Sequence, residues 1–105
     1  MGQFTVYENP NIDSNDIYPY FVDVQNELLK SLNSRMVIPI TPIQMMGNIT
    51  ISKLCPKIQI NDGEFILLTH QMTNVPTSAL NKPVMEIENL HDDVVAAIDL
   101  LITGI

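Results

Sequence analysis

The sequence predicts a mainly antiparallel β domain closed by one C-terminal helix. Several short segments alternate polar and apolar residues, which is the pattern of a half-buried strand. Residues 61–64, Asn-Asp-Gly-Glu, form a strong turn signal between two such segments. From residue 90 onward, apolar residues instead recur at helical spacing. A chain of 105 residues suffices for one domain, so we expect residues 1–105 to form a single one.

The N-terminal part of the chain contains three expected strands, over residues 3–7, 18–25 and 35–40. The polar residues 8–15 separate the first two. Pro39 lies inside the third and has no N–H to donate, so it predicts an edge position or a bulge there. Residues 26–33 are expected to form a loop or short turn with an exposed-looking apolar pair, Leu28 and Leu29. This pair is either core, which is the default for apolar residues, or part of an interface.

The middle of the chain is expected to contain a hairpin. Residues 56–60 alternate, and the Asp-Gly dipeptide of the following turn supplies positive φ for the return over residues 64–69. Residues 48–52 are expected to form a short strand. The strand pattern breaks over residues 71–76, and a loop is expected to continue to Pro83.

The end of the chain carries the signals of a helix. Asn89 is the expected N-cap, and Asp92 and Asp93 suit the positive end of the helix dipole. Gly104 is placed to end the helix. The apolar positions at helical spacing are Leu90, Val94, Ile98 and either Leu101 or Ile102.

The charge balance argues against direct nucleic-acid binding. Five basic residues face twelve acidic ones, for a formal net charge of −7. Neutralising phosphates requires clustered Lys and Arg, whereas the basic residues here are scattered. They are Lys30, Arg35, Lys53, Lys57 and Lys82.

The only cysteine, Cys55, excludes an intrachain disulfide and a cysteine-based zinc site. We expect it to be a small buried apolar residue. The lone cysteine and the absence of a signal peptide predict a reducing cytoplasm. No apolar run approaches the roughly 20 residues of a membrane span.

The sequence offers no pattern typical of an enzyme. His70 and His91 lie far apart and outside metal-binding spacings, and no glycine loop or nucleophile elbow is present. We therefore expect no catalytic residues, no metal and no cofactor. Met45 and Met46 either fill the core or form an adaptable contact surface.

The apolar ending of the chain is unusual, because domains commonly end in frayed polar residues. No charged side chain follows Asp99. The ending must therefore be buried in the core, buried in a homodimer, or offered to another protein.

Five collinear segments resemble the CcdB family, the toxins of CcdA/CcdB toxin–antitoxin modules. They cover residues 3–7, 21–25, 35–39, 72–76 and 97–105. The resemblance implies an SH3-like barrel of the CcdB/MazF type and a homodimer. It further implies a poison that binds the DNA gyrase A subunit, a CcdA-like antitoxin that neutralises it, repression of their shared operon, and a role in plasmid maintenance.

The resemblance also implies a gyrase-binding site. It comprises Asn26, Leu28, Leu29, Asp99, Ile102, Thr103, Gly104 and Ile105. The family carries Trp-Gly-Ile at its end, so Thr103 stands where the family has tryptophan. Residues 8–16 and 41–51 are weaker candidates for antitoxin contact.

Two other interpretations remain open. The missing tryptophan is compatible with an inactive relative that binds only antitoxin. A MazF-like endoribonuclease shares the fold, but it needs a basic groove with a catalytic arginine, and Arg35 is the only arginine here.

Overall fold

The computed structural model describes residues 3–29, 31–46 and 53–104. Two sequence-based expectations lie outside these ranges: the short strand over residues 48–52 and the placement of Ile105. The described residues form one antiparallel sheet with a helix, α1 (His91–Thr103), at the end of the chain. This confirms the predicted mainly β fold, which is consistent with an SH3-like barrel.

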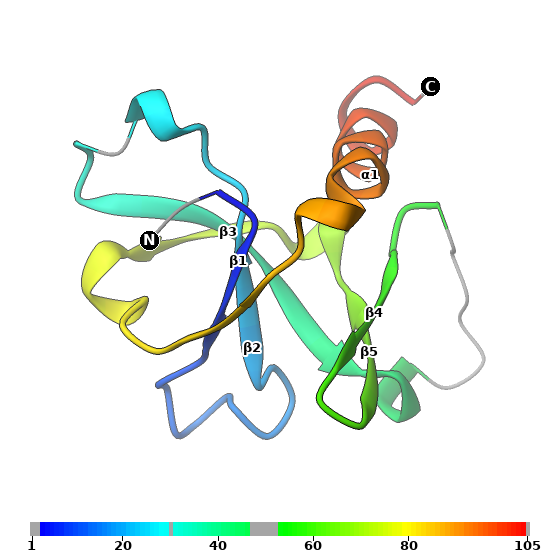
Figure 1. The fold of residues 1–105 in the computed structure, drawn as a ribbon, viewed down its shortest axis with the longest axis horizontal. Helices are drawn as coiled ribbons and strands as arrows, with labels where there is room; N and C mark the ends of the chain where they lie inside the picture. The colour runs from blue at the N-terminus through cyan, green and yellow to red at the C-terminus, as the bar shows by residue number, and fades with distance from the viewer. Residues whose placement is uncertain (1–2, 30, 47–52, 105) are drawn as a thin grey trace.

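Seven strands are found in the described residues: β1 (Thr5–Glu8), β2 (Tyr20–Asp23), β3 (Ser34–Pro42), β4 (Lys57–Ile60), β5 (Gly63–Leu67), β6 (Thr73–Pro76) and β7 (Pro83–Glu86). Their order in the sheet is β4-β5-β3-β2-β1-β7, and β6 also pairs with β3. Five 3₁₀ turns join them within the same residues: η1 (Glu27–Leu29), η2 (Ile43–Met46), η3 (Thr69–Gln71), η4 (Thr77–Ala79) and η5 (Glu88–Leu90). Figure 1 shows the long β3 running through the middle of this arrangement.

The prediction that Pro39 marks an edge strand or a bulge is wrong. β3 is an interior strand, and Pro39 pairs in register with Phe21 of β2. On its other side, β3 pairs with β6 up to Val37 and with β5 from Ile40 onward. The Pro39 carbonyl accepts the N–H of Leu68 on that side, at 2.9 Å. Pro39 therefore lies between the part of β3 that pairs with β6 and the part that pairs with β5, so its missing N–H interrupts neither pairing.

The core lies on the concave side of the sheet and is closed by the end of the chain. β-Branched and leucine side chains from the strands are fully or almost fully buried there, and they include Val6, Val22, Ile38, Ile40, Ile58, Ile60 and Leu67. α1 contributes Val94 to this cluster and also buries Ala97. Cys55 is buried as predicted, in a separate apolar cluster.

The hairpin of β4 and β5 is confirmed, but its turn differs from the prediction. Positive φ occurs at Asn61, at 54°, and not at the Asp-Gly dipeptide. Gly63 is favoured for a different reason, since a Cβ there would lie 2.8 Å from the Phe65 ring and the ring would have to move. Asparagine tolerates the left-handed region better than other side chains, which explains its place in the turn.

Two strands were not predicted: β6 occurs where the pattern breaks, and β7 begins at Pro83, the last residue of the predicted loop. β6 and β7 pair with β3 and β1, yet neither alternates between buried and exposed positions. Pro83 is the first residue of β7, a position where a strand tolerates proline. The missing alternation explains why the sequence pattern did not reveal them.

The predicted C-terminal end of the helix is correct, and the predicted N-cap is wrong. Asn89 lies within η5, and Leu90 occupies the N-cap position of α1 without a side-chain cap. At the other end, Gly104 is left-handed with φ of 74°, and its N–H donates to the Leu100 carbonyl at 3.0 Å. Gly104 therefore ends the helix as predicted.

Candidate functional site

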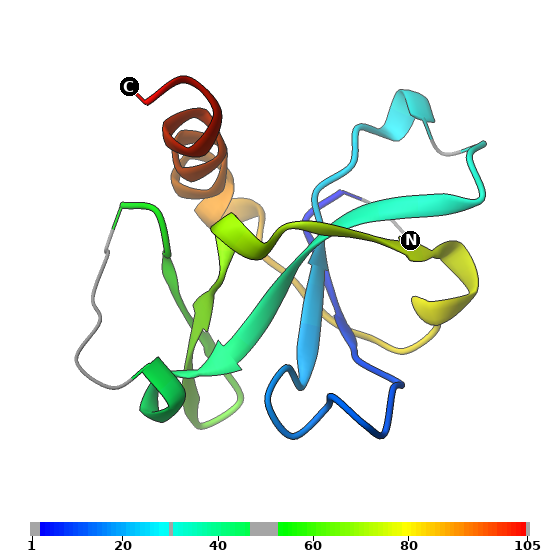
Figure 2. The same ribbon diagram turned by 180° about the vertical axis from the view of Figure 1, so that it is seen from behind.

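The structure divides the predicted contact residues between two surfaces. The first, called here the 26–29 loop, contains Asn26, Leu28 and Leu29. The second, called here the α1 end, contains Asp99, Ile102, Thr103 and Gly104. Figures 1 and 2 show η1 and α1 at the same edge of the molecule but on opposite sides of it. The predicted site is thus two separate surfaces of one chain.

The 26–29 loop is a tight turn built by Asn26. The Asn26 side-chain oxygen accepts the Leu28 N–H at 2.8 Å, and its carbonyl accepts the Leu29 N–H at 2.9 Å. Such a side-chain turn is a common role of asparagine. The turn presents Leu28 at 89% and Leu29 at 48% exposure, so the pair is not part of the core, which was the default expectation. When a partner covers an aliphatic side chain that is exposed to water, the free energy of the system falls.

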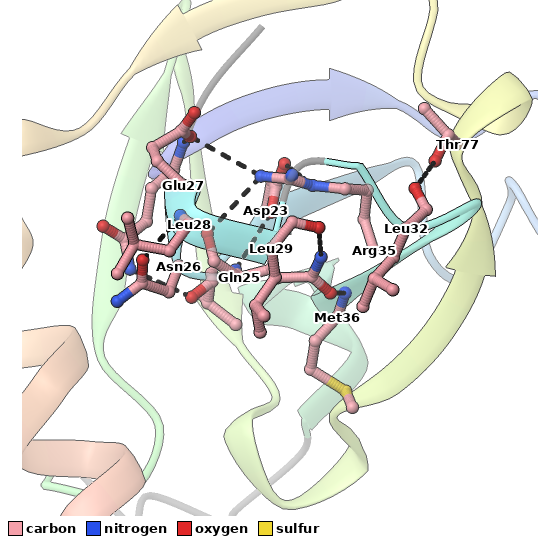
Figure 3. A network of polar contacts seen from close by, with 12 residues as sticks. Asp23, Gln25, Asn26, Glu27, Leu28, Leu29, Leu32, Arg35, Met36 and Thr77 are labelled. Atoms are coloured by element: carbon pink, nitrogen blue, oxygen red, sulfur yellow. Dashed lines mark hydrogen bonds and ion pairs between the residues drawn. The ribbon is translucent and has the colours of Figure 1, made fainter.

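Beneath the loop, the buried side chain of Gln25 links it to β3 (Figure 3). The Gln25 Nε2 donates to the Leu29 carbonyl at 3.0 Å, and its Oε1 accepts the Met36 N–H at 3.1 Å. The last residue of the turn is therefore tied by one side chain to the central strand.

An ion pair next to Gln25 extends this network. Arg35 Nε lies 2.8 Å from Asp23 Oδ2, and both side chains are buried. Arg35 Nη2 also approaches Glu27 of the loop at 3.5 Å. Burial raises the pKa of the Asp23 carboxyl, while the hydrogen bond from Arg35 acts in the opposite direction. Charge and hydrogen bonding thus join β2, β3 and the loop.

This network was not predicted from the sequence. The polar residues Asp23, Gln25 and Arg35 stand inside segments with strand character, which is a signal that they are satisfied by partners. Their partners depend on the pairing register of β2 with β3. That register cannot be deduced from the residues alone.

The α1 end is exposed in the single chain. Ile102 is 70% exposed, and Leu101 and Val95 are also exposed. Thr103 lies beside Ile102, and its hydroxyl donates to the Asp99 carbonyl at 2.7 Å, one turn earlier. The described part of the apolar ending therefore does not complete the core of the chain. It remains available to a second subunit or to another protein.

An open groove of about 660 Å³ lies between the 26–29 loop and the start of α1. Its lining is rich in carboxylates, from Glu27, Glu86, Glu88 and Asp92. His91 also lines it and packs edge-on against Phe4, with ring centroids 4.8 Å apart. Within the described residues, no group of three or more potential ligands is arranged to hold a metal. The groove is lined by residues far apart in the chain, so no local sequence pattern predicts it.

The two weaker antitoxin candidates differ in what the structure describes. Of residues 8–16, Glu8 ends β1 and the others form a loop, where the Asn9 side chain donates to the Tyr18 carbonyl at 2.8 Å and Ile12 is 82% exposed. In residues 41–51, Met45 is exposed, which suits a contact surface better than core filling. Residues 47–51 lie outside the described ranges.

The sequence model of the CcdB protein family matches residues 3–104 of this chain. The chain belongs to the CcdB family. CcdB proteins are toxins of toxin–antitoxin systems that poison DNA gyrase. The match spans both surfaces described above, apart from Ile105. No described helix has both the length and the apolar character needed to cross a bilayer.

Proposed function

We propose that this CcdB family member is the toxin of a type II toxin–antitoxin module and poisons gyrase by binding its A subunit. A CcdA-like antitoxin neutralises it, and the two together repress their own operon in plasmid maintenance. The toxin is a cytoplasmic, single-domain homodimer that binds protein and needs no catalytic residue, cofactor, membrane or direct nucleic-acid contact. The observation that carries the proposal is the family match over residues 3–104.

The two exposed surfaces support a mechanism of binding. Leu28 and Ile102 are large aliphatic side chains, each mostly exposed in the chain alone. Covering such side chains is favourable, by about 1.5–3 kcal/mol for each one fully buried. A protein that binds one state of an enzyme more tightly shifts the enzyme toward that state. Binding the cleaved-DNA state of gyrase would therefore trap it without any reaction on the toxin.

The homodimer matches this target in symmetry. A two-fold dimer presents each surface twice, related by the same axis. The exposed apolar α1 end is suited to lie near that axis and meet a two-fold partner. Since Thr103 replaces the family's tryptophan, we propose that the aliphatic side chains of Leu28, Leu29 and Ile102 supply most of the apolar contact.

One alternative retains a specific observation in its favour. Thr103 lacks the aromatic surface that gives interface hot spots their large contributions. A relative that binds antitoxin but not gyrase is the second candidate function. The endoribonuclease is disfavoured, because Arg35 is buried and paired with Asp23 and so does not face an RNA surface.

Expression in bacterial cells separates these functions. The proposal expects growth arrest that disappears in cells carrying a resistant gyrase A subunit and in cells that co-express a CcdA-like antitoxin. If expression does not slow growth and the protein still binds antitoxin, the result would support a relative that binds only antitoxin. Growth arrest unaffected by the gyrase allele, together with RNA cleavage by the purified protein, would contradict the proposal.

A further inference from the structure

We propose that Gln25 is a positioning residue, whose side-chain amide holds the 26–29 loop in the shape that presents Leu28 and Leu29 to gyrase. The inference rests on the proposed function and assigns a role to a residue outside the predicted contact set. Gln25 is 9% exposed and so makes no extensive contact with a partner itself. Gln25 would affect gyrase binding through the shape of the loop.

The two hydrogen bonds of the Gln25 side chain require an amide. The Leu29 carbonyl can only accept, and the Met36 N–H can only donate. One side chain must therefore donate and accept at once, at the reach of glutamine. Glutamate would turn a second acceptor toward the Leu29 carbonyl, and methionine would leave both backbone groups without this partner.

The backbone of Gln25 is fixed as firmly as its side chain. Its N–H donates to Asp23 Oδ1 at 3.0 Å, and its carbonyl accepts from Arg35 Nη2 at 3.4 Å. Gln25 thus joins the buried ion pair to the far end of the turn. Figure 3 shows these contacts converging beneath the loop, with Gln25 between Arg35, Met36 and Leu29.

Positioning matters here because core packing cannot fix side chains that lie in water. Leu28 and Leu29 take their directions from the backbone of the turn, and that backbone is set by Asn26 and Gln25. If the loop were free, only a fraction of molecules would present the binding shape. The apparent affinity would fall by that fraction.

The test compares Gln25→Met and Gln25→Glu with the wild type, using purified gyrase A subunit as the probe. We expect about tenfold weaker gyrase binding in both variants, with antitoxin affinity within about twofold of the wild type. Gln59→Met, on the exposed side of β4, is the matched control and should leave both affinities unchanged. Circular dichroism confirms that each variant is folded.

A double-mutant cycle separates positioning from general weakening of the fold. In a Leu28→Ala/Leu29→Ala background, Gln25→Met should have little further effect on gyrase binding, because the side chains it positions are gone. Full additivity of the two effects would overturn the inference. So would unchanged gyrase binding in Gln25→Met.

A measurement on the wild-type chain covers the case in which a variant does not fold. Amide hydrogen exchange should show the Leu28 and Leu29 N–H groups protected in the free toxin. Exchange at the rate of an unstructured peptide would overturn the inference. A wild type that does not bind gyrase would instead refute the proposed function, and the inference would fall with it.

Discussion

The 26–29 loop and the α1 end both expose large aliphatic side chains, but different interactions hold them in place. The loop is supported from below by buried polar groups of β2 and β3, centred on Gln25 and the Asp23–Arg35 pair. The α1 end is supported by its own helix, through the Thr103 hydroxyl and the Gly104 cap. One surface depends on the interior of the domain, and the other depends on local backbone geometry.

This difference predicts where binding and stability are coupled. Changes beneath the loop should alter both the fold and the partner contact, because the same hydrogen bonds serve both. Changes at the α1 end should alter binding with little effect on global stability, since helix ends open locally at low cost.

The largest effect is expected from Asp23→Ala, which leaves Arg35 buried without its partner. Removing one member of a buried ion pair costs about 3–5 kcal/mol, so urea denaturation should show a loss of that size. Asp16→Ala, at an exposed loop position, is the control and should change stability by no more than about 0.5 kcal/mol. Equal effects of the two substitutions would contradict a stabilising role for the network.

Leu28→Ala and Ile102→Ala test the contact surfaces themselves. Each should weaken gyrase binding by about 1.5–3 kcal/mol, or tenfold and more, because an aliphatic side chain is no longer buried on binding. Thermal unfolding should hardly change, since both side chains are exposed in the chain alone. Ile12→Ala removes an equally exposed side chain elsewhere, and calorimetry should show unchanged gyrase affinity for it.

Thr103→Trp sharpens the comparison by restoring the family's aromatic residue at the α1 end. We expect gyrase binding to strengthen by about 1–2 kcal/mol, from the added area and aromatic contacts. Ala96→Trp places the same ring on an exposed helical position outside the predicted contacts. Surface plasmon resonance measures the gyrase affinity of both variants. A similar gain in affinity in both would contradict a specific contact at position 103.

Gly104→Ala adds a single methyl group and isolates the helix cap. A Cβ at this position would meet none of the described atoms within 4 Å, so its cost comes from the positive φ alone. That cost is about 1–2 kcal/mol and should appear mainly as fraying of the last helical turn and weaker gyrase binding. Gly104→Asn should destabilise the helix end less than Gly104→Ala does. Amide hydrogen exchange of the α1 end measures both, and faster exchange in Gly104→Asn than in Gly104→Ala would contradict this prediction.

The sequence predicted the strands whose residues alternate between polar and apolar or form a short apolar run. β1, β2, β3 and the hairpin of β4 and β5 were found in this way, although burial alternates clearly only in β4. β6 and β7 were missed because their neighbours, and not their own patterns, make them strands. Asn89 was misplaced because η5 moves the start of α1 beyond it.

The candidate site was predictable in its exposed part and unpredictable in its support. Leu28 and Leu29 stood beside polar residues in a segment without strand pattern, and both are exposed. The support from Gln25 requires knowing that Met36 of β3 lies beside it and that the turn brings the Leu29 carbonyl back toward it. Register and loop shape supply that information, and the linear sequence does not.

The binding mechanism is tested most directly by a DNA cleavage-complex assay with purified gyrase and purified toxin. We expect the wild type to accumulate cleaved DNA held by gyrase, and added CcdA-like antitoxin to reverse this. We further expect that a Leu28→Ala/Ile102→Ala variant, folded by circular dichroism, loses the effect while Ile12→Ala retains it. Unchanged gyrase turnover with the wild-type toxin, or full poisoning by the double variant, would contradict this mechanism.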